Sequence, residues 1–267
     1  MKTCFTSFSR QEWTLRECAD RAVKEGFHGL EIRGKDCCHI SPDSPEGYIR
    51  DAAAMLSDCG LFVPCVTGYT RFAQPDMQSM HAQVETVKRY AELCVRLGAP
   101  GIRSFMGAWP EGMELARAQE MTIRGLQLAA EALAGSGVRL LLETHDSVKS
   151  GAILAPLLEQ VGDEVGVLLD IAHPYDAGEC VGRTLELIGS RIHHVHIKDF
   201  THRVNGVPVY CEIGKGVLPV RETVRSLRQA GYEAYFCLEW EKGVPEAGSI
   251  SFDEQLASFK RVMEEEA

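Results

Sequence analysis

Short apolar runs alternate with amphipathic stretches along the whole chain, and this alternation limits the folds that the sequence allows. Segments such as "AVKEGFHGLEI" and "QAGYEAYFCLE" share one order, in which a helical pattern ends at a glycine and an apolar run follows within a few residues. The predicted strands are 2–6, 28–32, 61–66, 100–105, 138–143, 165–170, 192–197 and 234–239. The predicted helices are 13–25, 46–59, 76–97, 111–135, 150–161, 178–189, 219–230 and 252–264. Strands that alternate with helices indicate parallel βαβ units.

Eight successive units of this kind predict an α/β fold of the (β/α)8 TIM barrel type. The chain has 267 residues, close to the roughly 250 that are usual for this barrel. A doubly wound open sheet is the alternative, but no Gly-x-Gly-x-x-Gly motif follows the first predicted strand. The sequence contains no linker-like tract and no low-complexity segment. We therefore expect one domain that spans residues 1–267.

The charge balance disfavours whole classes of partner. The chain has 28 Lys and Arg against 38 Asp and Glu, a formal net charge of −10, whereas nucleic acids and anionic membranes attract basic surfaces. The N-terminal residues lack a signal-peptide core, and no apolar run reaches the roughly 18 residues of a membrane span. The ten cysteines, including adjacent Cys37 and Cys38, show no paired spacing and no CxxC. These features predict a soluble cytoplasmic protein with reduced thiols.

Four neighbouring strands are predicted to end in residue types that bind metals. Glu143 follows "LLL", Asp170 follows "VLL", His196 ends "HHVH" and Glu239 follows "FCL". Functional residues of a barrel project from the carboxyl ends of its strands, so these four side chains should point into the same part of the barrel mouth. A single carboxylate at such a place equally suits a helix cap, as Asp170 before "IAHP" illustrates. Four such residues at matching positions on consecutive strands favour a metal site.

Three carboxylates and one imidazole form a hard donor set. This set suits one divalent metal, with Mn²⁺ as the first choice and Mg²⁺, Co²⁺ or Zn²⁺ as alternatives. It also explains why His196 lies in an otherwise apolar strand, since burial of an ionisable group is costly without a partner. His194 lies two residues earlier on the same face, so we expect it deeper in the barrel as a support or a core residue. His193 should face the helices.

The segments "LLLETH", "LLDIAHP", "HVHIKDF" and "CLEWE", in this order, resemble the sugar phosphate isomerase/epimerase family of xylose isomerase-like barrels. The resemblance extends over nearly the whole chain, because "AVKEGFHGLEIRG" looks like the first helix and second strand of that family. The segment "GKGVLPVRETVRSLRQAGYEAYFCLEWE" looks like its seventh helix and last strand. These motifs are specific for the superfamily and its metal site, and not for a substrate.

The resemblance implies a role for each matching residue. Glu143, Asp170, His196 and Glu239 would bind one divalent metal, and Glu143 and Glu239 would also act as the acid/base pair. His173 matches a family histidine that hydrogen-bonds a substrate oxygen. Ketose epimerases of this group carry an arginine six residues after the histidine of strand seven. Here that position is His202, and Arg203 follows one residue later as the candidate substrate contact.

Other candidate substrate contacts come from position alone. Lys198 lies two residues after His196 on the same face, His145 follows the Glu143 strand, and Arg103 lies near the end of the fourth strand. For each of them an ordinary rim or packing role is an equal alternative. The segment "GKG" around Lys215 offers backbone N–H groups for a phosphate, although a lone Gly-x-Gly is a weak signal.

Together these residues predict a divalent-metal-dependent isomerase or epimerase that acts on a small sugar, keto sugar or keto-inositol. The expected reaction removes a proton next to a carbonyl and passes through a metal-stabilised enediolate. Loss of a neighbouring hydroxyl from the same enediolate would give a dehydration instead, as in the inosose dehydratases of this superfamily. That lyase is the principal alternative.

Two rival functions belong to other classes. Endonuclease IV shares the predicted fold, but it needs additional histidines on strands three and four, where this chain has "CVTGY" and "RSFMG". A non-catalytic sugar-binding barrel would not need both Glu143 and Glu239 beside the metal. The expected partner is therefore a sugar or polyol, with no nucleic acid and no membrane. The sequence leaves open the substrate and its phosphorylation, the metal and the oligomeric state, so a homo-oligomer stays among the alternatives.

Overall fold

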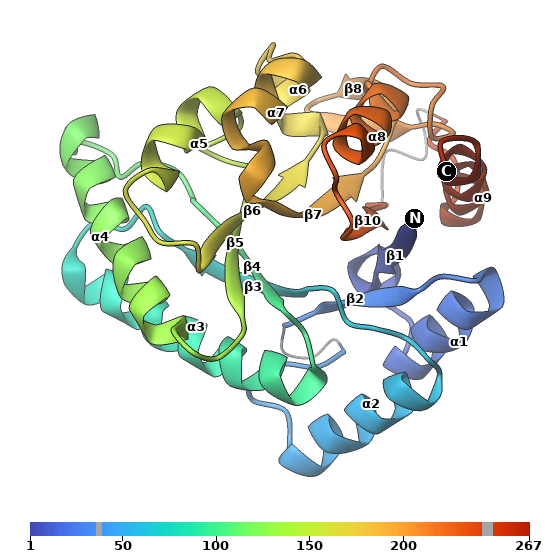
Figure 1. The fold of residues 1–267 in the computed structure, drawn as a ribbon, viewed down its shortest axis with the longest axis horizontal. Helices are drawn as coiled ribbons and strands as arrows, with labels where there is room; N and C mark the ends of the chain where they lie inside the picture. The colour runs from blue at the N-terminus through green and yellow to red at the C-terminus, as the bar shows by residue number, and fades with distance from the viewer. Residues whose placement is uncertain (36–38, 242–247) are drawn as a thin grey trace.

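The computed structural model describes residues 1–35, 39–241 and 248–267 as a closed barrel of eight parallel strands inside a ring of helices (Figure 1). Around the barrel the strands follow the order β1-β10-β7-β6-β5-β4-β3-β2. The barrel strands are β1 (Lys2–Thr6), β2 (Gly29–Arg33), β3 (Val66–Arg71), β4 (Gly101–Phe105), β5 (Arg139–Glu143), β6 (Val165–Asp170), β7 (Ile192–Ile197) and β10 (Tyr235–Leu238). This topology confirms the predicted TIM barrel. Cys37 and Cys38, which we expected as reduced thiols, lie outside the described residues.

Helices cover the outside of the barrel, whose circumference is closed by the pairing of β1 with β10. They are α1 (Leu15–Glu25), α2 (Glu46–Asp58), α3 (Met77–Leu97), α4 (Leu115–Leu133), α5 (Gly151–Leu158), α6 (Ala172–Asp176), α7 (Val181–Ile188), α8 (Val220–Gln229) and α9 (Phe252–Glu265), with short 3-10 turns η1 (Ser7–Arg10) and η2 (Gly189–Arg191). The last helix, α9, returns to the first strand, where the rings of Phe252 and Phe5 lie 5.5 Å apart (Figure 1). None of the helices that the structure describes is long and apolar enough to cross a bilayer.

The third strand lies further along the chain than the sequence indicated. We expected it at 61–66, but β3 runs from Val66 to Arg71, and Phe62 forms only an isolated bridge to Gly29. Pro64 lies inside the expected range and has no N–H to donate to a neighbouring strand. The apolar run before β3 therefore lies beside β2 without becoming a regular strand.

A two-stranded antiparallel hairpin follows β7, and the sequence analysis did not include it. Its strands are β8 (Phe200–Val204) and β9 (Val207–Tyr210), joined by Asn205 and Gly206. Both turn residues have positive φ angles, 50° and 82°, as the common two-residue hairpin turn requires. The hairpin therefore forms part of the connection between β7 and α8.

Strand register brings the polar strand ends together. Asp170 of β6 pairs directly with His196 of β7, and His196 pairs with Cys237 of β10. Glu239 follows β10 and donates its backbone N–H to the carbonyl of Ile197. Successive residues of a strand alternate between the two faces, so these neighbours share the inner face of the barrel.

Candidate metal centre

Four buried side chains meet at the carboxyl end of the barrel. Glu143 ends β5, Asp170 ends β6, His196 lies in β7 and Glu239 follows β10. Each side chain offers one ligand atom, and these atoms all lie within 4.8 Å of one another. All four residues are at most 6% exposed. The structure thus brings together the set that the strand ends predicted.

The donor atoms of this cluster fit a divalent cation. Asp170 Oδ2, His196 Nδ1 and Glu239 Oε2 are buried and face one another, and their close contacts among the described residues are ion pairs with Lys198 and with each other. Carboxylates buried side by side are costly without compensating positive charge, so this arrangement suits a bound cation. Oxygen donors with one imidazole suit Mn²⁺, Mg²⁺ or Zn²⁺. We name the set of Glu143, Asp170, His196 and Glu239 the carboxylate–histidine cluster.

Two cationic side chains hold the carboxylates of the cluster in place. Nη1 of Arg103, in β4, donates to Oε2 of Glu143 at 2.8 Å. The ammonium of Lys198 lies 2.8 Å from Oδ2 of Asp170 and 2.5 Å from Oε2 of Glu239. Lys198 also reaches Oε1 of Glu241 at 3.3 Å. Both cations are buried, so these ion pairs compensate charges that water does not reach.

The pKa values of the cluster diverge because of these contacts. Burial raises the pKa of Glu143 above its usual value, although the Arg103 guanidinium opposes the shift. Burial also acts on Glu239, but His196 and Lys198 outweigh it and hold its pKa well below the usual value. For Lys198, the nearby carboxylates outweigh burial and keep its pKa well above normal. The cluster is therefore an electrostatically coupled unit.

The histidine of the cluster has partners on both ring nitrogens. Nδ1 of His196 lies 3.2 Å from Oε2 of Glu239 and 3.8 Å from Oε1 of Glu143. Nε2 lies 2.9 Å from Oε2 of Glu31. The same oxygen of Glu31 lies 2.7 Å from Nε2 of His194. Glu31 was not among the predicted site residues. The feature that could have indicated it is a carboxylate within the apolar run "HGLEI".

A pocket of about 160 Å³ opens above the cluster. Its lining residues are Phe8, Thr67, Tyr69, Arg103, Phe105, Glu143, His145, Asp170, His173, Lys198, Glu239 and Glu241. His145 and His173 lie together in its wall, with ring centroids 4.3 Å apart, and Nε2 of His173 is 3.6 Å from Oδ2 of Asp170. Five substrate contacts were predicted, and four of them, Arg103, His145, His173 and Lys198, line this pocket.

The fifth predicted contact, Arg203, and the phosphate candidate Lys215 lie elsewhere. Arg203 belongs to the hairpin strand β8 and pairs with Asp176 of α6 at 2.7 Å, outside the residues that line the pocket. Lys215 pairs with Glu212 at 2.8 Å. The N–H groups of Gly214 and Gly216 both donate to Oδ2 of Asp199, so this segment already uses the donors that we considered for a phosphate.

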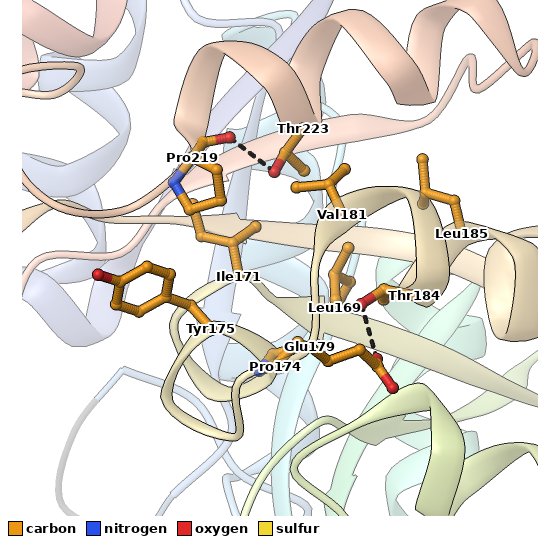
Figure 2. Close-up of a pocket in the computed structure, with 10 residues that line it drawn as sticks. All are labelled: Leu169, Ile171, Pro174, Tyr175, Glu179, Val181, Thr184, Leu185, Pro219 and Thr223. Atoms are coloured by element: carbon orange, nitrogen blue, oxygen red, sulfur yellow. Dashed lines mark hydrogen bonds between the residues drawn. The ribbon is translucent and has the colours of Figure 1, made fainter.

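A second hollow lies outside the barrel, among α6, α7 and the start of α8 (Figure 2). It measures about 20 Å³, and apolar side chains such as Leu169, Ile171 and Val181 form most of its wall. Its one carboxylate, Glu179, accepts hydrogen bonds from Thr184 and from backbone N–H groups at the start of α5. The carboxylate of Glu179 is therefore already used by the N–H groups at the start of α5 and by Thr184.

Comparison with known families agrees with this geometry. The family described as Xylose isomerase-like TIM barrel matches residues 19–261. The chain belongs to this family. Proteins similar to the chain include an isomerase and an epimerase. This membership confirms the resemblance that the strand-end motifs indicated.

Relatives resemble the chain over most of their length. A protein of Streptomyces coelicolor assigned as a hydroxypyruvate isomerase is 25% identical over 266 residues, which cover 90% of this chain and 91% of that protein. The fructoselysine 3-epimerase of Escherichia coli O157:H7 is 24% identical over 259 residues, 90% of each chain. A crystal structure of the IolI protein with a bound zinc atom superposes with a TM-score of 0.81 at 18% identity, over 100% of this chain and 98% of the other.

Proposed function

We propose that this protein is a divalent-metal-dependent isomerase or epimerase of a small keto sugar or keto acid. The observation that carries the proposal is the carboxylate–histidine cluster, whose four ligand atoms lie within 4.8 Å of one another beneath a polar pocket. The named relatives, a hydroxypyruvate isomerase and a fructoselysine 3-epimerase, support the same class of reaction. A bound zinc atom in the IolI structure supports the metal.

The cluster residues would bind the metal and also move the proton. A divalent cation held by the carboxylate–histidine cluster supplies Lewis acidity at the carbonyl oxygen of the substrate, which acidifies the neighbouring C–H bond. Glu143 and Glu239 reach the pocket from β5 and β10, which β6 and β7 separate in the barrel. One of these carboxylates takes the proton from the α-carbon, and the C–H electron pair moves toward the carbonyl to give an enediolate.

Return of the proton decides the product. Delivery to the opposite face of the same carbon gives an epimer, whereas delivery to the neighbouring carbon gives the aldose or ketose isomer. Arg103 fixes Oε2 of Glu143, so Oε1 is the oxygen that stays available for proton transfer. Lys198 holds Oε2 of Glu239 near Asp170. His145 and His173 line the same pocket and are placed to hydrogen-bond substrate hydroxyl groups.

The pocket favours a small substrate without a phosphate group. Its volume, about 160 Å³, lies below the roughly 300–1,000 Å³ of common ligand pockets. Among the lining residues that the structure describes, both cations, Arg103 and Lys198, are paired with carboxylates. Phe8, Tyr69 and Phe105 add aromatic rings to the pocket wall, and such rings pack well against the C–H groups of a sugar.

Proton exchange tests this function without knowledge of the product. The metal-loaded protein is incubated in deuterated water with free ketoses, hydroxypyruvate, keto-inositols and their phosphate esters, and deuterium uptake is measured by mass spectrometry after removal of the metal. We expect uptake at the α-carbon of at least one unphosphorylated compound, and its loss in Glu143→Gln and in Glu239→Gln. Unchanged exchange in Glu143→Gln, or no exchange in any compound with Mn²⁺, Mg²⁺, Co²⁺ or Zn²⁺, would contradict the proposal.

The same assay separates the dehydratase alternative. A dehydratase and an isomerase share the first proton removal, so both incorporate deuterium. Only the dehydratase lowers the mass of the organic product by one water molecule. We expect a product of unchanged composition.

A further inference from the structure

A carboxylate inside the barrel contacts the one imidazole of the carboxylate–histidine cluster. Glu31 is the middle residue of β2 and has 0% exposure. Its Oε2 lies 2.9 Å from Nε2 of His196 and 2.7 Å from Nε2 of His194. Both histidines come from β7, more than 160 residues further along the chain. Burial of an unpaired carboxylate costs free energy, and the two histidines compensate its charge and hydrogen-bonding capacity.

The geometry determines which nitrogen of His196 faces the carboxylates. An ionised carboxylate has only acceptor atoms, so the two Nε2 atoms donate to Oε2 of Glu31. In a neutral imidazole with its proton on Nε2, the lone pair is on Nδ1. Nδ1 of His196 is the atom that lies 3.2 Å from Glu239 and has no hydrogen bond of ordinary geometry.

We propose that Glu31 is a positioning residue for the metal centre, because it fixes the ring of His196 so that the Nδ1 lone pair points toward the three carboxylates. His194 has the same role one step further away, since its Nε2 holds the same oxygen of Glu31. Partners of this kind behind a metal-binding histidine change metal affinity by about 10–100-fold. The inference rests on the proposed metal centre and adds a residue that does not touch the metal or the substrate.

A different role for the same residues makes an opposite prediction. Glu31, His194, His196 and Cys237 also have ligand atoms within 4.8 Å of one another, so they form a possible second metal set. A metal there would need nitrogen lone pairs that point toward Glu31, and both hydrogen bonds to its Oε2 would be lost. Metal stoichiometry therefore distinguishes a positioning role from a second site.

Metal affinity in the variant Glu31→Gln tests the proposal directly. Zn²⁺ or Mn²⁺ binding is measured by competition with a chromophoric chelator, and folding is followed by circular dichroism. We expect one metal per wild-type chain and binding about 10–100-fold weaker in Glu31→Gln. Cys237→Ser is the matched control, because Cys237 is equally buried beside His196 and makes no hydrogen bond to either histidine. The metal affinity of Cys237→Ser should stay within about threefold of the wild type, a smaller change than that expected on loss of a residue that hydrogen-bonds a metal-binding histidine.

Two results of that titration would overturn the positioning role. One is wild-type affinity in Glu31→Gln. The other is two metals per wild-type chain, with one of them lost in Cys237→Ser. Failure of the proposed function looks different, since the wild type would then bind no metal or would bind it without proton exchange.

Nitrogen NMR of the zinc-loaded wild type provides a readout that does not depend on how well a variant folds. Two-bond ¹H–¹⁵N correlations identify which ring nitrogen of His196 carries a proton. We expect a proton on Nε2 and the metal on Nδ1. A proton on Nδ1 would contradict the proposal, even if Glu31→Gln fails to fold.

Discussion

Nη1 of Arg103 lies 2.8 Å from Oε2 of Glu143, and the two side chains are only 7% and 3% exposed. The pair joins the neighbouring strands β4 and β5 at the base of the pocket. Arg103 therefore does more than line the pocket, because it fixes one oxygen of Glu143 and leaves the other directed toward His196. The position of the Glu143 carboxylate thus depends on an arginine from the adjacent strand.

Replacement of Arg103 should destabilise the protein strongly. Removal of one partner from a buried ion pair leaves an uncompensated charge, so Arg103→Met should lower the free energy of unfolding by about 3 kcal/mol. Urea denaturation of chelator-treated protein measures this change. The control is Arg183→Met, because Arg183 pairs with Glu186 at 2.6 Å on the surface and should contribute less than about 1 kcal/mol. Equal costs for the two variants would contradict the buried pair.

The metal affinity should depend most strongly on the four residues of the carboxylate–histidine cluster. Asp170→Asn removes one charged donor of the cluster, so we expect affinity to fall by more than the roughly 100-fold that loss of a residue behind a ligand produces. Glu241→Gln is the control, because Glu241 lies 3.3 Å from Lys198 yet is 45% exposed and outside the cluster. Isothermal titration with Mn²⁺ measures both. A loss in Glu241→Gln as large as in Asp170→Asn would remove Asp170 from the ligand set.

Gly216 is a position where the backbone approaches another group too closely for a side chain. A Cβ there would lie 2.1 Å from Oδ1 of Asp199 and 2.5 Å from the carbonyl oxygen of Phe200. Gly216→Ala should therefore destabilise the protein by about 1–3 kcal/mol. Gly182, in α7, has no atom within 4 Å of its Cβ position, so Gly182→Ala should stabilise by about 0.5 kcal/mol. Thermal unfolding shows whether each variant is less or more stable than the wild type. A Gly216→Ala variant as stable as the wild type would contradict the close approach.

His39 should make stability depend on pH in mildly acidic solution. Burial lowers the pKa of His39, and its Nε2 lies 3.0 Å from the carbonyl oxygen of Trp13. The unfolded chain takes up a proton near pH 6.5 while folded His39 stays neutral, so the free energy of unfolding falls as pH decreases below about 6.5. The slope from one such group is at most about 1.4 kcal/mol per pH unit. Urea denaturation gives the free energy of unfolding at pH 7.5 and 5.5. We expect the difference between these two values to be smaller in His39→Gln than in the wild type. An equal difference in both proteins would contradict this assignment.

The barrel and the carboxylate–histidine cluster could be predicted because both depend on local order along the chain. Apolar runs that end in Glu143 and Asp170 coincide with the ends of β5 and β6, and parallel strands place such ends on one side of a barrel. The strand at 61–66 was wrong, because an apolar run can lie beside a barrel without strand pairing on both sides.

The missed features depend on distant partners or on a turn signal that was overlooked. Asn205-Gly206 is a common hairpin turn, and it sits between the strands that we did not predict. Glu31 gives no local indication of its role, since its partners lie 163 and 165 residues away. Strand register alone brings these groups together, and a sequence pattern does not contain that information.

Crystals grown or soaked with Mn²⁺ test the central claim most directly, because anomalous scattering locates the ion without assumptions. We predict one strong peak per chain, within bonding distance of Glu143, Asp170, His196 and Glu239, that is lost from crystals of Asp170→Asn. A peak at another place, or no peak in crystals from a solution in which Mn²⁺ far exceeds the dissociation constant measured by titration, would contradict it.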